Sequence, residues 1–247
     1  MNRLALLGST LLLLSASPSP AHAQLGFEWE LGMAFVAKNN IRIPGDGGTL
    51  FSFKDDFDVQ PNYAQRLRVS YLLGSRHWLA FLYAPLDIRA DGAFDSPVLF
   101  QDVTFPAGEA IRGRYKFNSY RLTYRYRAVT SARFGLAIGA SAKLRDAKIS
   151  LQSTGDAAVK SNVGLVPLLS AELRLRVSGT TGLLIDAEGL AAPQGRAADV
   201  LVALEIEPAE RFRFYAGYRV LEGGADNDTV YNFALIHYIV LGANLSF

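Results

Sequence analysis

The C-terminal stretch YNFALIHYIVLGANLSF, residues 231–247, alternates between two kinds of side chain. A period of two is the geometry of a β-strand, because successive side chains of a strand point to opposite faces of the sheet. We therefore predict a long strand with one apolar face. That face consists of Tyr231, Phe233, Leu235, His237, Ile239, Leu241, Ala243, Leu245 and Phe247, and the opposite face of Asn232, Ala234, Tyr238, Gly242, Asn244 and Ser246.

The same alternation recurs along most of the chain. The other alternating segments are 27–35, 66–73, 119–126, 132–145, 169–177, 181–190, 198–207 and 212–220, and the segment 77–86, which is apolar on both faces, is also assigned as a strand. Short connections lie near 74–75, 129–131, 178–180 and 208–210, and longer ones at 38–62, 87–111, 150–163, 192–197 and 223–229. Short turns at one end and longer loops at the other are typical of an outer-membrane β-barrel, whose tilted strands need only about 9–11 residues to cross the bilayer. The predicted fold class is all-β: a closed antiparallel up-and-down transmembrane β-barrel of about ten strands.

The composition limits the classes of protein that fit. The chain has 247 residues, of which 50% are hydrophobic and 19% charged, and it has no cysteine. These values exclude global disorder, a disulfide scaffold, a thiolate nucleophile and a cysteine-ligated metal site. The net charge of +2 gives no reason to expect a nucleic-acid partner. Length and composition together suggest a single folded domain.

The N-terminus has the pattern of a secretory signal peptide. Arg3 precedes an apolar run over residues 4–14, and the small-x-small sequence Ala21-His22-Ala23 follows a break rich in serine and proline. The run is too short to cross a bilayer as a helix, which needs about 20 residues. We predict a cleaved signal peptide at 1–23 and a β-barrel domain at 24–247.

The alternation alone does not say whether the apolar faces point into the interior of a soluble, lipocalin-like barrel or out into lipid. Two features favour lipid. The small residues Gly, Ala and Ser stand between the charges of the polar face, as a crowded lumen requires. Aromatic residues concentrate toward the strand ends, with aliphatic residues between them, as in the two interfacial girdles of a membrane barrel. These aromatic residues are Phe27, Trp29, Tyr71, Tyr124, Tyr126, Phe134, Phe212 and Phe214 near the short turns, and Phe35, Tyr120, Tyr231 and Phe233 near the longer loops.

The chain ends on Phe247, with Leu245, Ala243 and Leu241 at alternate positions before it. This ending resembles the C-terminal assembly signal of bacterial outer-membrane β-barrel proteins. The resemblance implies insertion by the outer-membrane assembly machinery after transit through the periplasm. It also implies a final location in the outer membrane, in contact with its lipid and lipopolysaccharide. We expect a monomer.

Charged residues on the predicted inward face suggest what fills the lumen. The basic ones outnumber the acidic ones by eleven to seven. A small barrel is filled by side chains, so interlocked ion pairs are the favoured interpretation, and a narrow pore for anions or small solutes is the alternative. The basic residues are Arg66, Arg68, Arg121, Arg125, Arg133, Lys143, Arg145, Arg174, Arg176, Arg213 and Arg219, and the acidic ones are Glu28, Glu30, Glu172, Asp186, Glu188, Asp199 and Glu205.

A catalytic constellation is not visible in the sequence. Omptin proteases use Asp and His at the outer rim, and lipid A deacylases use a His-x-Ser element, but His237 faces lipid by parity and Ile239 stands where the serine would be. The acidic run at 55–58 could bind a divalent cation, but a solvated acidic turn is the favoured interpretation. We predict no catalytic, metal or cofactor site and a non-enzymatic envelope or surface-interaction role. An omptin-like or lipid A-modifying hydrolase stays as an alternative.

Overall fold

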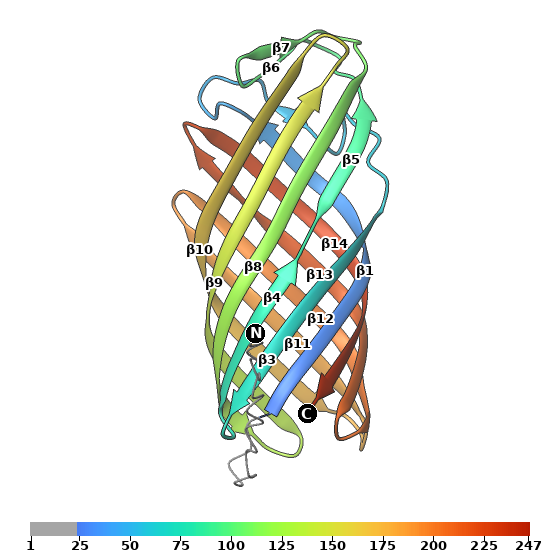
Figure 1. The fold of residues 1–247 in the computed structure, drawn as a ribbon, viewed down its shortest axis with the longest axis vertical. Helices are drawn as coiled ribbons and strands as arrows, with labels where there is room; N and C mark the ends of the chain where they lie inside the picture. Colours follow the sequence, from blue (N-terminus) through green and yellow to red (C-terminus); the bar gives the residue numbers. More distant parts are fainter. Residues whose placement is uncertain (1–23) are drawn as a thin grey trace, which may run out of the picture.

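The structure is a computed structural model that describes residues 24–247, so the predicted signal peptide lies outside the described residues. The described chain forms a tall closed barrel (Figure 1). Consecutive barrel strands pair antiparallel, and the last strand pairs with the first. The barrel strands are β1(Gln24–Arg42), β3(Asn62–Leu73), β4(His77–Ala84), β8(Ile111–Thr130), β9(Phe134–Gln152), β10(Ala157–Arg176), β11(Thr181–Ala192), β12(Gly195–Ala209), β13(Phe212–Asn227) and β14(Val230–Ser246). The prediction of a closed antiparallel barrel with ten strands is confirmed.

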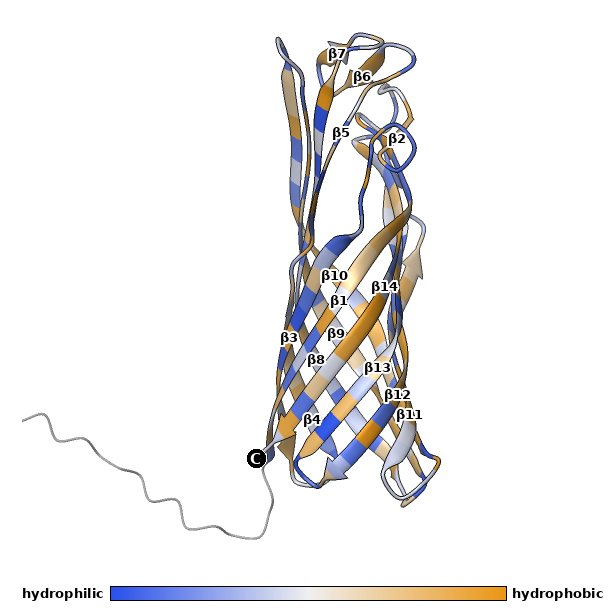
Figure 2. Cartoon of the chain, turned by 90° about the vertical axis from the view of Figure 1, so that its right-hand side faces the viewer, coloured by the Kyte–Doolittle hydropathy of each residue, from blue (hydrophilic) through white to orange (hydrophobic). Residues whose placement is uncertain are grey.

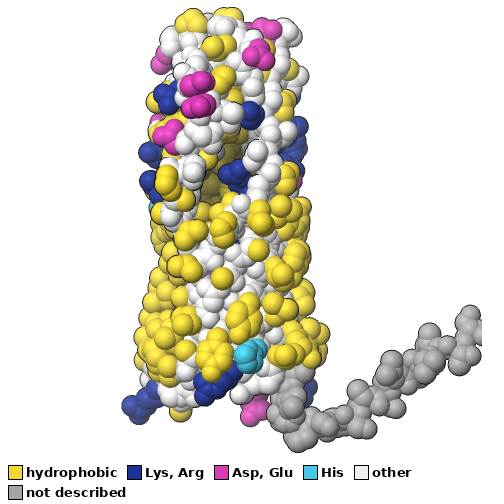
Figure 3. All heavy atoms as spheres, turned by 90° about the vertical axis from the view of Figure 1, so that its left-hand side faces the viewer, with side chains coloured by type: hydrophobic (Ala, Val, Ile, Leu, Met, Phe, Trp, Pro, Cys, Tyr) yellow, Lys and Arg dark blue, Asp and Glu magenta, His cyan; other side chains and the backbone are white. Residues whose placement is uncertain are grey.

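Alternation decides which face of each strand points outward. On β14, Ile239 and Leu241 are 62% and 66% exposed, whereas Val240 between them is 2% exposed. Hydrophobic and hydrophilic residues alternate along the strands of the lower barrel in Figure 2. On the face shown in Figure 3, hydrophobic side chains cover the lower barrel as a band. Closure of the ring lets neighbouring strands pair their backbone amides within the barrel, as a hydrocarbon environment requires. No part of residues 24–247 forms a helix that could cross a membrane.

The strands are longer than a membrane crossing requires, and here the prediction from sequence was wrong. β8 and β10 each have 20 residues, and the connections predicted as loops at 150–163, 192–197 and 223–229 are short turns between extended strands. The outward face of these extensions carries polar residues such as Lys148, Ser150 and Ser161 in the β9–β10 ladder, beside two exposed valines at 159 and 163. Polarity marks the end of lipid contact, but backbone pairing does not depend on lipid and continues beyond it.

The two longest connections fold over the outer end of the barrel. They contain β2(Phe51–Ser52), β5(Asp87–Gly92), β6(Val98–Phe100) and β7(Val103–Phe105). β5 pairs with β8 above the end of β4, so part of the loop predicted at 87–111 is strand. Phenylalanines of both connections pack together: the rings of Phe53 and Phe57 stack at 4.9 Å, and those of Phe51 and Phe94 meet edge-on at 5.2 Å. We call Phe51, Phe53, Phe57, Phe94, Phe100 and Phe105 the outer cluster; all six are buried.

The acidic run at 55–58 has a local structural role. Asp55 accepts a hydrogen bond from the Ser52 hydroxyl at 2.6 Å, and Asp56 accepts one from the Ser52 backbone amide at 2.8 Å. These contacts close the turn after β2. The outer extension also carries exposed ion pairs, and the Arg114 guanidinium, hydrogen-bonded to Asp87 at 2.7 Å, holds the pKa of that carboxyl below its ordinary value.

Candidate functional site

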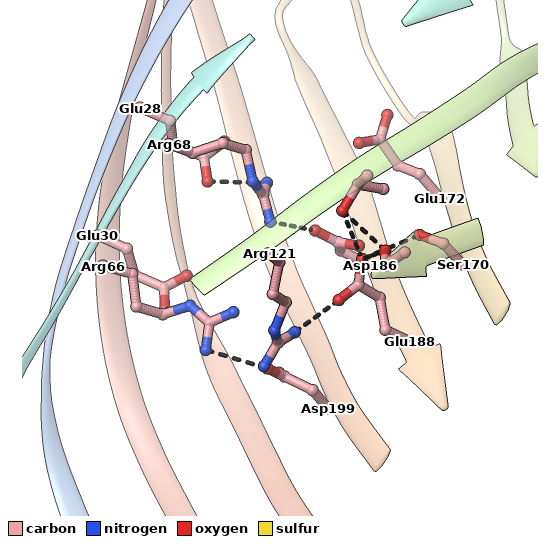
Figure 4. A network of polar contacts seen from close by, with 12 residues as sticks. Glu28, Glu30, Arg66, Arg68, Arg121, Ser170, Glu172, Asp186, Glu188 and Asp199 are labelled. Carbon is pink, nitrogen blue, oxygen red and sulfur yellow. Dashed lines mark hydrogen bonds and ion pairs between the residues drawn. The ribbon is translucent and has the colours of Figure 1, made fainter. Parts of the chain in front are cut away.

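A connected network of charged side chains lies inside the barrel (Figure 4). Six arginines and seven carboxylates contribute, from seven strands. On each strand the charged residues occupy the alternate positions that point inward. Closure of the ring then brings strands that are distant in sequence face to face. The members are Glu28 and Glu30 on β1, Arg66 and Arg68 on β3, Arg121 and Arg125 on β8, Glu172 and Arg174 on β10, Asp186 and Glu188 on β11, Asp199 and Glu205 on β12, and Arg219 on β13.

Asp199 is the centre of one half of the network. Its carboxylate accepts hydrogen bonds from Arg121 at 2.5 Å, Arg219 at 2.6 Å and Arg66 at 3.0 Å. Arg219 also holds Glu30 through two hydrogen bonds, at 2.8 and 2.9 Å. Because three arginines converge on one carboxylate and each of them also contacts a second, no single pair of residues holds this layer together.

Asp186 and Glu188 on β11 organise the other half. Asp186 accepts hydrogen bonds from Arg125 and, at 3.0 Å, from Arg68. Glu188 accepts from Arg121 at 2.6 Å and from the Ser141 hydroxyl at 2.5 Å. The hydroxyls of Thr123 and Ser170 also donate to Glu188, at 3.2 Å and 3.1 Å respectively. Hydroxyl groups therefore satisfy the carboxylate oxygens that the arginines leave free.

Aromatic side chains complete the layer. The Arg125 guanidinium lies over the Trp78 ring at 5.1 Å. The Tyr215 hydroxyl donates to Glu30 at 2.8 Å, and its ring occupies the space over Gly242 on the neighbouring strand. A Cβ atom at position 242 would lie 2.0 Å from Tyr215 Cζ, so the ring requires glycine there. The sequence analysis did not single out Trp78, Tyr215, Ser141 or Ser170. The signal that could have found them is their position on the inward-pointing face of their strands.

Central arginines of the network are buried: Arg125 is 1% exposed and Arg219 2%. A cavity of about 360 Å³ lies on the short-turn side, lined in part by Arg133 and Arg213. A second cavity, of about 380 Å³, lies on the outer side and is lined in part by Lys143 and Arg145. The two cavities lie toward opposite ends of the barrel.

Thirteen of the predicted lumen charges meet in this network, and the remaining candidates lie elsewhere. Arg133 and Arg213 line the cavity at the short-turn end, and Lys143 lines the outer cavity. Arg176 pairs with Glu207 near the short turns at 2.6 Å. The basic excess found in the sequence therefore lies outside the network layer, where carboxylates outnumber arginines by seven to six.

Both histidines of the described chain lie on the outer surface of the barrel wall. His237 Nδ1 is 2.5 Å from the Tyr218 hydroxyl on β13. His77 Nδ1 is 2.9 Å from the Tyr124 hydroxyl on β8. Each imidazole stacks on its tyrosine, and neither belongs to the network in the lumen.

No family model matches the sequence, and no curated protein is similar to it. Among solved structures, the outer membrane protease OmpT from Escherichia coli aligns with a TM-score of 0.57 at 8% identity, over 94% of this chain and 99% of OmpT. An outer membrane channel from Pseudomonas putida F1 aligns with a TM-score of 0.45 at 11% identity, over 96% of this chain and 100% of the channel. Ail, the attachment invasion locus protein of Yersinia pestis, gives 0.39 and 14%, over 90% and 98%. All are bacterial outer-membrane β-barrels. The predicted class is confirmed, without a specific subfamily.

Proposed function

We propose that this protein is a non-conducting, non-enzymatic outer-membrane barrel that presents its outer extension at the cell surface. The observation that carries the proposal is the buried network, in which charged side chains from seven strands meet inside the lumen. A buried arginine or carboxylate is costly to leave without a partner, so the layer resists the separation that an open pore would need. Export through a signal peptide cleaved at residue 23 and a monomeric state belong to this proposal.

The distribution of charge argues against the alternative of an anion pore. An anion passing through the lumen would meet the seven carboxylates of the network, and the six arginines there are already paired with them. The unpaired cations lie on either side of this layer. Basic residues at the two entrances attract anions to the mouths of the barrel, but they do not open a path between them.

The chemistry of the network favours a structural role over hydrolysis. Ser141 lies within hydrogen-bond distance of Glu188, but this carboxylate is also paired with Arg121 at 2.6 Å. A serine nucleophile needs a base that is free to take its proton, and an arginine-paired carboxylate is a poor base. Both described histidines lie across the barrel wall from this serine. These facts support a non-enzymatic assignment.

The outer extension is the part that fits a surface role. Above the apolar band, the outward face carries Arg89, Asp91 and Arg112, which are all largely exposed. Charged outward side chains are suited to water and to the phosphate groups of lipopolysaccharide, and they are unsuited to lipid tails. We propose that the outer-membrane lipid and lipopolysaccharide are the immediate partners of this region and that the outer-membrane assembly machinery inserts the chain.

Single-channel recording of the refolded protein in a planar bilayer tests the proposal. The wild-type barrel should give no discrete conductance steps. The double variant Arg121→Ala, Arg219→Ala removes two long side chains from the layer and should give steps, while Arg89→Ala on the outer extension should behave as the wild type. Discrete, anion-selective steps from the folded wild-type protein would overturn the proposal in favour of the pore.

A further inference from the structure

The barrel wall is interrupted on its outer half between β10 and β11. The β10–β11 ladder runs from Arg176↔Gly182 to Leu169↔Gly189 and stops there. Beyond this point β10 continues along β9, and β11 turns into β12 at Ala192↔Gly195. Among the described residues, no strand pairs with the free side of β10 over 157–168. Figure 3 shows a hollow in the wall at this height, directly above the hydrophobic band.

The outer cavity lies behind this interruption. Its volume of about 380 Å³ is in the range of small-molecule sites, about 300–1,000 Å³. Residues from both edges of the interruption line it, among them Val166 and Pro167 on β10 and Leu190 on β11. Deeper in, the lining is largely apolar and includes Ile149, Leu221 and Ile236. An apolar cavity that opens sideways at the top of the lipid-facing band can accept a hydrocarbon chain.

Three inward-facing cations line the same cavity, and none of them has an acidic partner. Within residues 24–247, no carboxylate lies within 4 Å of Lys143, Arg145 or Lys160, whereas every arginine of the network contacts at least one. Lys143 is only 3% exposed and lies 4.6 Å from the centre of the Phe117 ring.

Arg145 adds a second sign of an unfilled site. It donates to Asn162 at 2.5 Å, while its Nε atom is buried without a hydrogen-bond partner in the described chain. A buried cation without a counter-charge is unfavourable, so a bound anion would stabilise this group of side chains.

The height of the site relative to the membrane indicates whether a soluble or a membrane-borne ligand fits it. On the outward face of β10, Leu165 and Leu169 are 71% and 66% exposed, so lipid tails reach the lower edge of the interruption. One step higher in the ladder, Asp146 and Lys148 on β9 mark the polar zone. A molecule with its chain in the cavity would therefore hold its head group at the level of the unpaired cations.

We propose that this cavity binds a membrane-borne anionic amphiphile with a single acyl chain, a fatty acid or lysophospholipid, which enters sideways between β10 and β11. The acyl chain lies against Ile149, Leu190 and Ile236. The carboxylate or phosphate accepts hydrogen bonds from Arg145 and Lys160 and lies toward Lys143. The site is on the outer side of the network, so it does not depend on whether the lumen conducts.

Photo-crosslinking in nanodiscs of phosphatidylcholine tests this site. The probe is palmitic acid with a diazirine near its methyl end, and a hexadecanol with the same diazirine is the neutral counterpart. We expect palmitate to label peptides of β9, β10 and β11 that line the cavity, and hexadecanol to label them at least tenfold less, as the loss of one charge-assisted hydrogen bond implies. Ten millimolar inorganic phosphate should leave the labelling unchanged.

Variants separate the cavity from the lipid-facing wall. Arg145→Gln with Lys160→Gln should lower labelling at least tenfold, and Ala147→Trp should abolish it by filling the cavity. Ala142→Trp, on the exposed outward face of the same strand, and Arg89→Gln, on the outer extension, are the matched controls and should label as the wild type. Each variant is first shown to be folded by its resistance to unfolding in detergent before heating.

Three results would overturn the inference. One is labelling confined to outward residues of the barrel, another is equal labelling by palmitate and hexadecanol, and the third is full competition by inorganic phosphate, which would indicate a site for soluble anions. The conductance recording above has a different readout. A conducting barrel that still labels in the cavity would contradict only the proposed function, and a silent barrel without labelling would contradict only this site.

Discussion

Arg219 and Glu30 lie 189 positions apart in the sequence and meet in a two-point ion pair inside the barrel, with Nε 2.9 Å from Oε1 and Nη2 2.8 Å from Oε2. The planar guanidinium fits the carboxylate, and its remaining nitrogen donates to Asp199. One side chain on β13 thereby joins β12, its neighbour in the barrel, and β1, which lies beyond β14. The pair links distant parts of the chain.

Replacement of Arg219 by Ala should lower the free energy of unfolding by about 3–5 kcal/mol, because Glu30 and Asp199 would lose a buried counter-charge. Urea titration of the protein in lipid vesicles measures this change. The control is Arg196→Ala, which removes an exposed arginine paired with Glu222 and should cost less than about 1 kcal/mol. Equal losses in the two variants would contradict a special role of the buried pair.

The ring of Tyr215 over Gly242 predicts a steric effect. Gly242→Val should displace the ring, break its hydrogen bond to Glu30 and destabilise the barrel by about 1–3 kcal/mol. Urea titration with tyrosine and tryptophan fluorescence follows both stability and the packing of the ring. Gly155, where an added Cβ meets nothing within 4 Å, is the control position. A Gly155→Val effect as large as that of Gly242→Val would refute the steric explanation.

The lipid-facing band predicts a cost that depends on depth in the bilayer. Ile239→Arg places a charge on the outward face of β14, at a residue that is 62% exposed, and should cost about 2–4 kcal/mol. Thr229→Arg lies in the turn between β13 and β14 and should have an effect near zero. Refolding yield and urea titration in vesicles provide the comparison. If both arginines were tolerated equally, the apolar face would not be in contact with lipid.

The outer cluster should be locally stable and separable from the barrel. Phe53 is fully buried, and Phe53→Ala should cost about 3–5 kcal/mol in the stability of the two outer connections, because it removes a stacked ring. Limited proteolysis should then cleave within 93–110 while the barrel stays intact. Leu50→Ala, at a residue that is 54% exposed, should leave the cleavage rate unchanged. Cleavage within the barrel strands instead would show that the two regions unfold together.

The Asp87–Arg114 pair predicts how acid affects the outer extension. Because Arg114 holds the pKa of Asp87 below its ordinary value, the pair stabilises the β5–β8 contact fully above about pH 4, and the contribution is lost as the pH falls through the lowered pKa. The difference between wild type and Asp87→Asn in protection of β5 amides from hydrogen exchange should therefore be constant above about pH 4 and shrink below it. A difference that grows on acidification would reverse this sign and refute the prediction.

Local sequence was sufficient for the class of fold and for the orientation of most side chains. The period of two at residues 231–247 places Ile239 and Leu241 outward and Tyr238 inward, because the direction of a strand side chain depends only on its parity. The charged lumen residues follow from the same rule. The polar outer halves of β9 and β10 were interpreted as a loop, since hydropathy reports contact with lipid and not backbone pairing.

The partners of the lumen charges depended on the tertiary structure. Arg68 reaches Asp186, 118 positions away, only because closure of the ring brings β3 opposite β11. The same holds for the interruption between β10 and β11, because nothing local in residues 157–168 says that one edge of this strand is left unpaired. Parity is a property of each strand alone, whereas register, closure and the open edge arise from the way all ten strands meet around the barrel.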